Sequence, residues 1–203
     1  VLLAAILRRR RGVCVAGMHG KTSTAALLAH TLEALGAAPG FAIGAIVPQL
    51  GRHARMGAEQ KSFLVAETDE SDGTLREFFP EQAIVLNIDE EHLDFYASFE
   101  AVCDEFSTFA GQTSGQVFFC ADDARLAALY GERKKTVTFG FNPTADYRAE
   151  MQTDGSFEVW LRGNRLGVFL IRQFGEKNIS NAAAVPRPGW GFFTGKRSPD
   201  IIF

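Results

Sequence analysis

The sequence predicts an α/β fold in which helices flank a mostly parallel sheet and a small antiparallel β-meander is appended. The first observation is that short apolar runs alternate with helical patterns over residues 13–140, which is typical of parallel sheets. The second is a glycine-containing loop at residues 17–22, between the first apolar run and the first helical pattern. The third is a change after residue 146, where tight turns instead of helices join the strand-like segments.

Each expected element follows from its local pattern. The strands of the parallel part are short apolar runs, at residues 13–16, 63–67, 83–88, 117–120 and 136–140. The helices have apolar residues at helical spacing, at residues 23–35, 99–110 and 124–130. The meander, about residues 147–171, comprises strands at 147–151, 157–162 and 166–171 with turns at 153–155 and 163–164.

Composition narrows the class of protein. The chain has 203 residues, of which 46% are hydrophobic and 22% charged, as expected for one ordinary globular domain or one domain plus fragments. Its formal net charge of -3 argues against nucleic-acid binding, which needs a basic surface. No apolar stretch approaches the roughly 20 residues that cross a bilayer. Three widely spaced cysteines fit a reduced protein, so we expect a cytoplasmic protein without a membrane or nucleic-acid partner.

The loop at residues 17–22, Gly-Met-His-Gly-Lys-Thr, has the layout of a phosphate-binding loop. A strand that enters a glycine turn and then a helix directs backbone N–H groups and the positive end of the helix dipole at one point. Lys21 would reach the terminal phosphates, and the Thr22 hydroxyl would ligate Mg²⁺. Val15 occupies the position of the usual first glycine, so Gly17 begins a shortened loop. The alternative is a glycine turn that only connects strand to helix.

An acidic run, residues 67–72, begins at the end of the expected strand 63–67. Ligands of open parallel sheets bind beyond the carboxyl ends of the strands, where the phosphate loop also lies. Glu67 is nearest the strand end and is the best candidate for a magnesium ligand. For Asp69, Glu70 and Asp72, a solvated acidic turn is an equally good interpretation.

A third polar run, residues 87–94, follows the next strand and should reach the same edge of the sheet. His92 within it is a candidate metal ligand or general base, with a surface histidine that caps a helix as the alternative. Its convergence with two other polar runs favours the functional interpretation. His19 lies inside the loop itself and is a candidate phosphate contact.

Together these runs resemble the Mur ligases. The resemblance lies in four segments that occur in the family's order and approximate spacing, namely residues 17–24, 67–73, 87–96 and 178–182. It covers roughly residues 12–185 and implies the ATP-binding central domain of that family. Met18 departs from the pattern, because threonine or serine usually occupies this position in the family.

The resemblance implies an ATP- and Mg²⁺-dependent ligase of peptidoglycan biosynthesis that forms an amide through an acyl phosphate. It assigns catalytic roles to Lys21, Glu67 and His92, and a metal-binding role to Thr22, Glu67 and His92. It assigns nucleotide contacts to the loop, Gly17, Met18, His19, Gly20, Lys21, Thr22 and Ser23, and base contacts to Asn178 and Asn181. The small-molecule substrates it implies are ATP, UDP-N-acetylmuramate and L-alanine.

Several alternatives stay open at this point. The acidic run and the His-Leu-Asp-Phe-Tyr ending favour the branch that adds L-alanine, but the branch that reattaches recycled murein tripeptide is similar. A non-catalytic ATP-binding remnant is a further possibility. A folylpolyglutamate synthase uses a similar short loop, but the combined acidic and histidine runs argue against it. A GTPase switch is disfavoured because the sequence lacks Asn-Lys-x-Asp.

The family's domain order gives the remaining expectations. Residues 1–11 correspond to the end of an amino-terminal UDP-binding domain, and residues 12–185 to the ATP-binding domain. Residues 186–203 begin with two prolines in three residues, which would break the preceding helix. We therefore expect an aberrant or disordered tail there, from a frameshift or truncation. Oligomeric state is not predicted.

Overall fold

A computed structural model describes residues 2–59, 61–91, 95–171 and 175–185, and these form one continuous 10-stranded sheet with helices on both faces. The strand order is β10-β9-β8-β7-β6-β5-β1-β4-β2-β3. Neighbouring strands from β8 through β2 pair in parallel, whereas β3, β9 and β10 pair antiparallel with their neighbours. The expected mostly parallel α/β fold is confirmed.

The strands are β1 (Arg11–Ala16), β2 (Gly40–Val47), β3 (Arg52–Arg55), β4 (Phe63–Glu67), β5 (Gln82–Val85), β6 (Val117–Cys120), β7 (Thr136–Gly140), β8 (Tyr147–Met151), β9 (Phe157–Leu161) and β10 (Asn164–Phe169). The α-helices are α1 (Leu2–Leu7), α2 (Lys21–Ala34), α3 (Phe99–Gln112), α4 (Ala124–Tyr130) and α5 (Glu176–Ala182). Two short 3₁₀ helices occur at Pro48–Leu50 and Thr74–Glu77.

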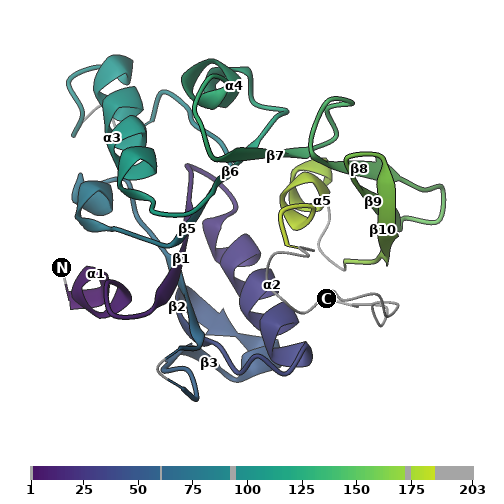
Figure 1. Ribbon diagram of the computed structural model, residues 1–203, viewed down its shortest axis with the longest axis horizontal. Helices are drawn as coiled ribbons and strands as arrows, with labels where there is room; N and C mark the ends of the chain where they lie inside the picture. Colours follow the sequence, from purple (N-terminus) through teal and green to yellow (C-terminus); the bar gives the residue numbers. More distant parts are fainter. Residues whose placement is uncertain (1, 60, 92–94, 172–174, 186–203) are drawn as a thin grey trace.

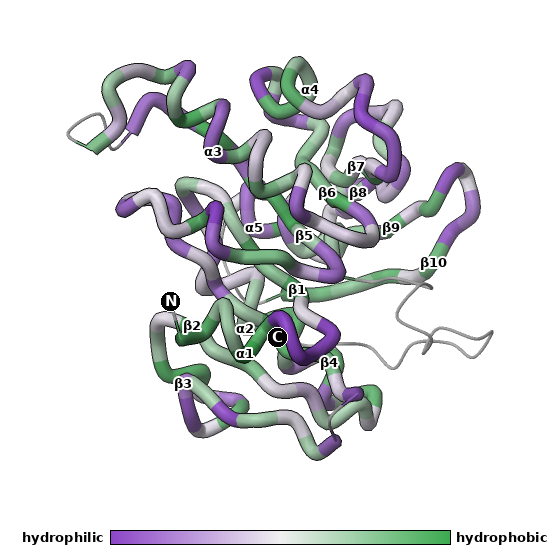
Figure 2. The backbone as a smooth tube through the Cα atoms, turned by 60° about the vertical axis from the view of Figure 1, so that its left-hand side comes forward, coloured by the Kyte–Doolittle hydropathy of each residue, from purple (hydrophilic) through white to green (hydrophobic). Residues whose placement is uncertain are grey.

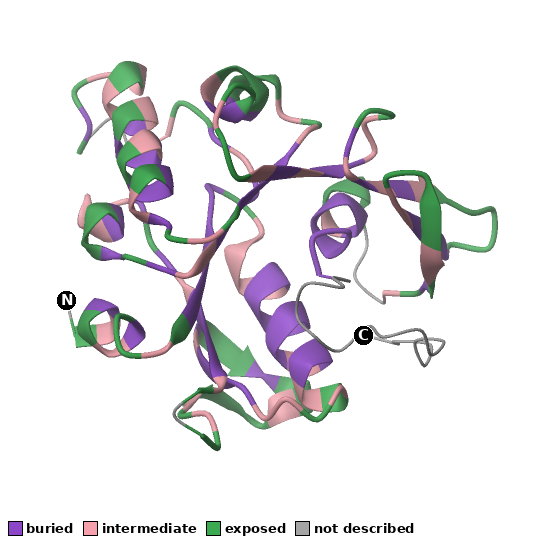
Figure 3. Cartoon of the chain, viewed as in Figure 1, coloured by how far each residue is buried: buried purple, intermediate pink, exposed green. Residues whose placement is uncertain are grey.

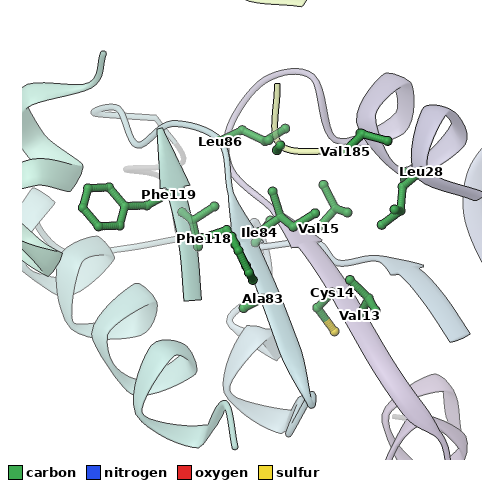
Figure 4. Packing of buried hydrophobic residues seen from close by; sticks show 14 of the residues in the cluster. Val13, Cys14, Val15, Leu28, Ala83, Ile84, Leu86, Phe118, Phe119 and Val185 are labelled. Carbon is green, nitrogen blue, oxygen red and sulfur yellow. The ribbon is translucent and has the colours of Figure 1, made fainter. Parts of the chain in front are cut away.

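The hydrophobic core lies on both sides of the central strands, with α3 and α4 on one face of the sheet and α2 and α5 on the other (Figure 1). Val15 of β1 lies toward Leu28 of α2, and Phe119 of β6 points away from them (Figure 4). Phe119 makes an edge contact with Tyr130 of α4, with ring centroids 5.6 Å apart. Apart from Arg11 and Gln82, the first residues of β1 and β5, strands β1, β5 and β6 are built from apolar residues and glycine (Figure 2) and are buried (Figure 3), as expected for strands covered on both faces.

Local sequence explains where the helices begin. The Ser98 side chain accepts a hydrogen bond from the Ala101 N–H and caps α3. Asp123 caps α4 by accepting from the Arg125 and Leu126 N–H groups at 2.9 and 3.1 Å. These caps fix where α3 and α4 begin, at the ends of the loops that follow β5 and β6. The two loops lie at the edge of the sheet where the parallel strands end.

Most expected elements are found within a few residues of their predicted bounds, but strands β2 and β3 were not predicted. β2 pairs with β4, and β3 pairs with β2. The meander also belongs to the main sheet, because β8 pairs with β7 through Phe139 and Gly140. The expected tail at residues 186–203 lies outside the described residues. Among the described residues, no helix is long and apolar enough to cross a membrane.

Candidate functional site

The three polar runs predicted to converge follow strands that are neighbours in the sheet, in the order β5-β1-β4. Backbone hydrogen bonds continue past the strand ends, because the Thr68 N–H donates to the Val15 carbonyl and the Leu86 N–H to the Ala16 carbonyl, both at 3.0 Å. The Thr68 hydroxyl also donates to the Val15 carbonyl. These bonds hold the loops after the three strands together at one edge of the sheet.

The loop between β1 and α2 needs glycine at two positions. Gly17 has φ of 130°, and a Cβ there would lie 3.0 Å from the backbone N and O of Asn87. Gly20, the residue before α2, has φ of 85°, and a Cβ there would lie 2.6 Å from the Asn181 side-chain nitrogen. Both backbones lie in a region that L side chains rarely adopt. The loop therefore passes close to the β5 loop and to α5, and α2 presents its N-terminus beside them.

Asn87 fixes the middle of this loop. Its side-chain oxygen accepts a hydrogen bond from the His19 N–H at 2.8 Å, and its amide nitrogen donates to the His19 carbonyl at 2.9 Å. The His19 side chain is half exposed and lies 3.1 Å from a carboxylate oxygen of Glu91. A side-chain amide carries both a donor and an acceptor. Asn87 uses both to hold the backbone of the loop at His19.

Lys21, at the start of α2, forms an ion pair with Glu70. Its Nζ lies 2.6 and 2.9 Å from the two carboxylate oxygens. The side chains of Lys21 and Glu70 are only 15% and 1% exposed. Burial raises the pKa of Glu70, and the hydrogen bond and charge of Lys21 lower it. Asp69 and Asp72 of the same run are exposed, and each accepts a hydrogen bond from a backbone N–H two residues later.

Thr22 and Glu67 bring two oxygen ligands together. The Thr22 hydroxyl donates to one Glu67 carboxylate oxygen at 2.6 Å, and the other oxygen accepts from the Gly44 N–H at 2.6 Å. Oxygen donors of this kind suit Mg²⁺, which usually retains waters and takes one or two protein ligands together with substrate phosphates. Within the described ranges, no group of three or more His, Cys, Asp and Glu side chains forms a metal site by itself. The donors present fit an ion shared with a phosphate ligand.

A cavity of about 1090 Å³ opens beside the loop, between the ends of β5, β6 and β7 and the starts of α4 and α5. Its lining includes His19 from the loop at residues 17–22, Asn87 from the loop after β5, and Asn181 from α5. Asn181 is buried, and its side-chain amide lies against Gly20 of the loop. A cavity of this size, next to the loop predicted to bind phosphate, has room for a nucleoside.

Two aspartates shape this cavity and were not identified from the sequence. Asp122 accepts hydrogen bonds from the Phe141 N–H (3.0 Å), the Asn142 N–H (2.7 Å) and the Ser180 hydroxyl (2.6 Å), which joins the ends of β6 and β7 to α5. Asp123 caps α4 and accepts from the Ile88 N–H at 3.0 Å. Both lie within three residues of the end of β6, so the rule that ligands bind beyond strand carboxyl ends could have identified them.

Comparison with known proteins assigns the family. The model of the Mur ligase middle domain matches residues 15–186. The chain belongs to the Mur ligase family. The family resemblance drawn from the sequence runs is thereby confirmed.

Curated Mur ligases similar to this chain include UDP-N-acetylmuramate–L-alanine ligases. The protein from Syntrophus aciditrophicus is 36% identical over 190 residues, which cover 90% of this chain and 39% of the relative. The protein from Sorangium cellulosum is 39% identical over 190 residues, which cover 90% of this chain and 40% of the relative. The chain thus spans about two fifths of the length of the curated relatives it matches.

Solved Mur ligase structures share the fold. UDP-N-acetylmuramate:L-alanyl-gamma-D-glutamyl-meso-diaminopimelate ligase from Neisseria meningitides superposes with a TM-score of 0.81 at 29% identity, covering 91% of this chain and 62% of that one. UDP-N-acetylmuramate-alanine ligase from Thermotoga maritima gives a TM-score of 0.72 at 26% identity, covering 91% of this chain and 41% of that one.

The structure brings together most of the residues that the Mur ligase runs predict. Lys21, Thr22 and Glu67 meet at one edge, and Asn181 lines the adjoining cavity. Met18 is buried in the loop before α2, and Ser23 is half-buried in the first turn of α2. Asn178 lies on α5, half-buried, one turn before Asn181. His92 lies outside the described residues.

Proposed function

We propose that this chain supplies the ATP-binding domain, residues 12–185, of a ligase that joins L-alanine to UDP-N-acetylmuramate in peptidoglycan biosynthesis. The convergence of Lys21 and Thr22 with Glu70 and Glu67 at the sheet edge carries the proposal. The curated relatives, at 36% to 39% identity, support the choice of substrates.

The proposed site divides the nucleotide between the loop and the cavity. Backbone N–H groups of the loop and the Lys21 ammonium bind the phosphates of ATP. Thr22 and Glu67 hold Mg²⁺, together with His92, and the ion neutralises negative charge on the phosphates. Asn181 and Asn178 contact the base. The cavity beside the loop supports this division, because His19 and Asn87 line it next to the phosphate loop and Asn181 lines it on α5.

The proposed reaction has two steps. A carboxylate oxygen of the lactyl group of UDP-N-acetylmuramate attacks the terminal phosphorus of ATP, the bond to the ADP oxygen breaks, and an acyl phosphate forms. The amine of L-alanine then attacks the acyl carbon, the tetrahedral intermediate expels phosphate, and the amine loses a proton. Phosphoryl transfer of this kind depends mainly on positioning and charge neutralisation, which Lys21 contributes at this edge.

The cysteines are consistent with a reaction in the cytoplasm. Cys14, Cys103 and Cys120 are all free thiols. Cys14 and Cys120 are buried, and burial raises the pKa of Cys120 to about 11. Thiols in this form match a reducing compartment, where disulfides are rare.

The second candidate is ligation of a murein tripeptide in place of L-alanine. It is favoured by the structural similarity to the ligase from Neisseria meningitides, whose name specifies a tripeptide substrate. Sequence identity to that protein is 29%, below the 36% to 39% identity to the curated L-alanine ligases. We therefore prefer L-alanine as the substrate.

A hybrid enzyme tests the reaction. Residues 12–185 replace the matching segment of the ligase from Syntrophus aciditrophicus, and phosphate release is measured with ATP, Mg²⁺, UDP-N-acetylmuramate and L-alanine. We expect phosphate release that requires both UDP-N-acetylmuramate and L-alanine. The product should exceed UDP-N-acetylmuramate by the mass of one alanine residue.

The matched control is the same hybrid with Lys21→Ala, which should lose turnover. Wild-type turnover by the Lys21→Ala hybrid would refute the role of this residue. Turnover with the tripeptide but not with L-alanine would select the second candidate. A folded hybrid that binds ATP without turnover with either acceptor would support a non-catalytic remnant.

A further inference from the structure

Glu70 is the most deeply buried acid of the run at residues 67–72, and it pairs with the cationic side chain of Lys21. Its side chain is 1% exposed, whereas Asp69 and Asp72 are exposed and Glu67 is half-buried. Both of its carboxylate oxygens lie within hydrogen-bond distance of the Lys21 Nζ, at 2.6 and 2.9 Å. A buried carboxylate that engages an ammonium with both oxygens restricts where the ammonium can lie.

The backbone of Glu70 is itself anchored. The Tyr96 hydroxyl, which is buried, donates to the Glu70 carbonyl, and the Gly73 N–H donates to the same carbonyl at 3.4 Å. Tyr96 belongs to the segment that follows β5, whereas Glu70 follows β4. The segment after β5 therefore anchors the loop that carries Glu70. The Glu70 carboxylate is thus a rigid acceptor for the Lys21 side chain.

The geometry leaves the ammonium able to serve two partners. A lysine ammonium has three N–H donors, and Glu70 engages two of them. The third can donate to a phosphate oxygen while the ion pair remains. Separation of the pair would leave a nearly fully buried carboxylate without its cation, which is strongly unfavourable. The ion pair is therefore better suited to persist in the nucleotide complex than to exchange for phosphate.

We propose that Glu70 is a positioning residue that holds the Lys21 ammonium in place for the terminal phosphates and stays paired with it when nucleotide binds. The proposal rests on the proposed nucleotide site and assigns to Glu70 a role that acts through Lys21. Its opposite is a latch, in which Glu70 competes with phosphate for the lysine. The two differ in sign, because removal of a latch strengthens nucleotide binding and removal of a positioning residue weakens it.

The test is calorimetric titration of the full 203-residue chain with ATP in excess Mg²⁺, comparing wild type with Glu70→Gln. We expect Glu70→Gln to weaken binding about tenfold, because one well-placed charged hydrogen bond contributes that much. Asp69→Asn is the matched control. It also removes one negative charge, but from an exposed side chain at the neighbouring position. It should change the affinity less than about twofold.

Two further variants separate positioning from general damage to the fold. In a Lys21→Met background, Glu70→Gln should produce no additional loss of ATP affinity, since its effect passes through Lys21. Glu70→Asp keeps the charge but shortens the side chain, and should restore part of the affinity lost in Glu70→Gln. Circular dichroism establishes that each variant is folded, and Glu70→Asp replaces Glu70→Gln in the comparison if the latter is not.

The outcomes distinguish this proposal from the proposed function. Tighter or unchanged ATP binding by Glu70→Gln, with wild type binding normally, overturns the positioning role and leaves the nucleotide site intact. An equal loss in the Lys21→Met background also overturns it, because the effect would then bypass the lysine. If the folded wild-type chain binds no ATP, the proposed nucleotide site itself fails, and the positioning role fails with it.

Discussion

At the residue scale, the site depends on charges that are buried and paired. Lys21 and Glu70 are largely removed from solvent, and the Lys21 ammonium stabilises the charged form of the Glu70 carboxylate. Thr22 and Glu67 are likewise joined by a 2.6 Å hydrogen bond. The side chains that would bind phosphate and Mg²⁺ are thus already held near one another, which reduces the entropy lost when a ligand binds.

Replacing Lys21 should destabilise the chain in a pH-dependent way. Lys21→Met leaves the Glu70 carboxylate buried without its cation, and we expect a loss of about 3 kcal/mol at pH 7. Burial raises the pKa of Glu70 above its ordinary value of 4.5, and Lys21 opposes that rise. Without Lys21 the pKa rises further. The folded variant then binds a proton more readily than the unfolded chain, so its stability falls as pH rises above 4.5.

Denaturant unfolding at pH 4.5 and pH 7 measures this effect. The difference in unfolding free energy between wild type and Lys21→Met should be smaller at pH 4.5 than at pH 7. Lys134→Met serves as the control, because Lys134 is an exposed lysine and its replacement should cost little at either pH. A penalty for Lys21→Met that does not change with pH would contradict the buried pairing.

The sequence could identify the chemistry of the site residues but not all of their partners. Lys21, Thr22 and Glu67 were predicted from motif and strand position, and the structure places them together. Asp69 and Glu70 could not be separated, because adjacent acids look alike in sequence and only tertiary packing buries one of them.

At the element scale, the connection from β1 to α2 depends on backbone that only glycine adopts easily. Gly20→Ala adds a Cβ at positive φ and places it 2.6 Å from the side chain of the buried Asn181. Gly36→Ala, just after α2, adds a Cβ at positive φ with no heavy atom within 4 Å. We expect Gly36→Ala to cost roughly 1–2 kcal/mol from backbone strain alone.

Gly20→Ala should cost more than Gly36→Ala, because the contact with Asn181 adds to the same strain. It should also weaken ATP binding, since it displaces the loop or α5, whereas Gly36→Ala should leave the affinity unchanged. Denaturant unfolding and calorimetry of the two variants measure both effects. Equal stability losses and equal ATP affinities would show that the approach of α5 to the loop is unimportant.

Elements were predictable where the local pattern decided their structure. Strands β4, β6, β7 and β8 were predicted at their observed bounds, because each is a compact run with strand propensity. β2 is an apolar run in which Gly44 weakens the strand pattern, and β3 is the polar segment Arg-His-Ala-Arg, which has no strand pattern of its own. Their pairing with β4 and with each other decides their structure. The joining of β8 to β7 is also a tertiary contact that local patterns do not specify.

At the scale of the whole molecule, the site is assembled from segments far apart in the chain. The loop after β1, the run after β4 and Asn87 after β5 meet because their strands are neighbours, and Asp122 links α5 to the same edge. This arrangement follows from the parallel topology, in which the carboxyl ends of the strands lie on one edge. We propose that this edge binds a magnesium–nucleoside triphosphate complex.

Calorimetric titration of the 203-residue chain with ATP, with and without Mg²⁺, tests whether this edge binds the nucleotide. We expect one ATP per chain, tighter binding with Mg²⁺ than in a chelator, and at least about a tenfold loss of affinity in folded Lys21→Ala. A folded wild-type chain that takes up no ATP, or a Lys21→Ala variant that binds as tightly as wild type, would contradict the account.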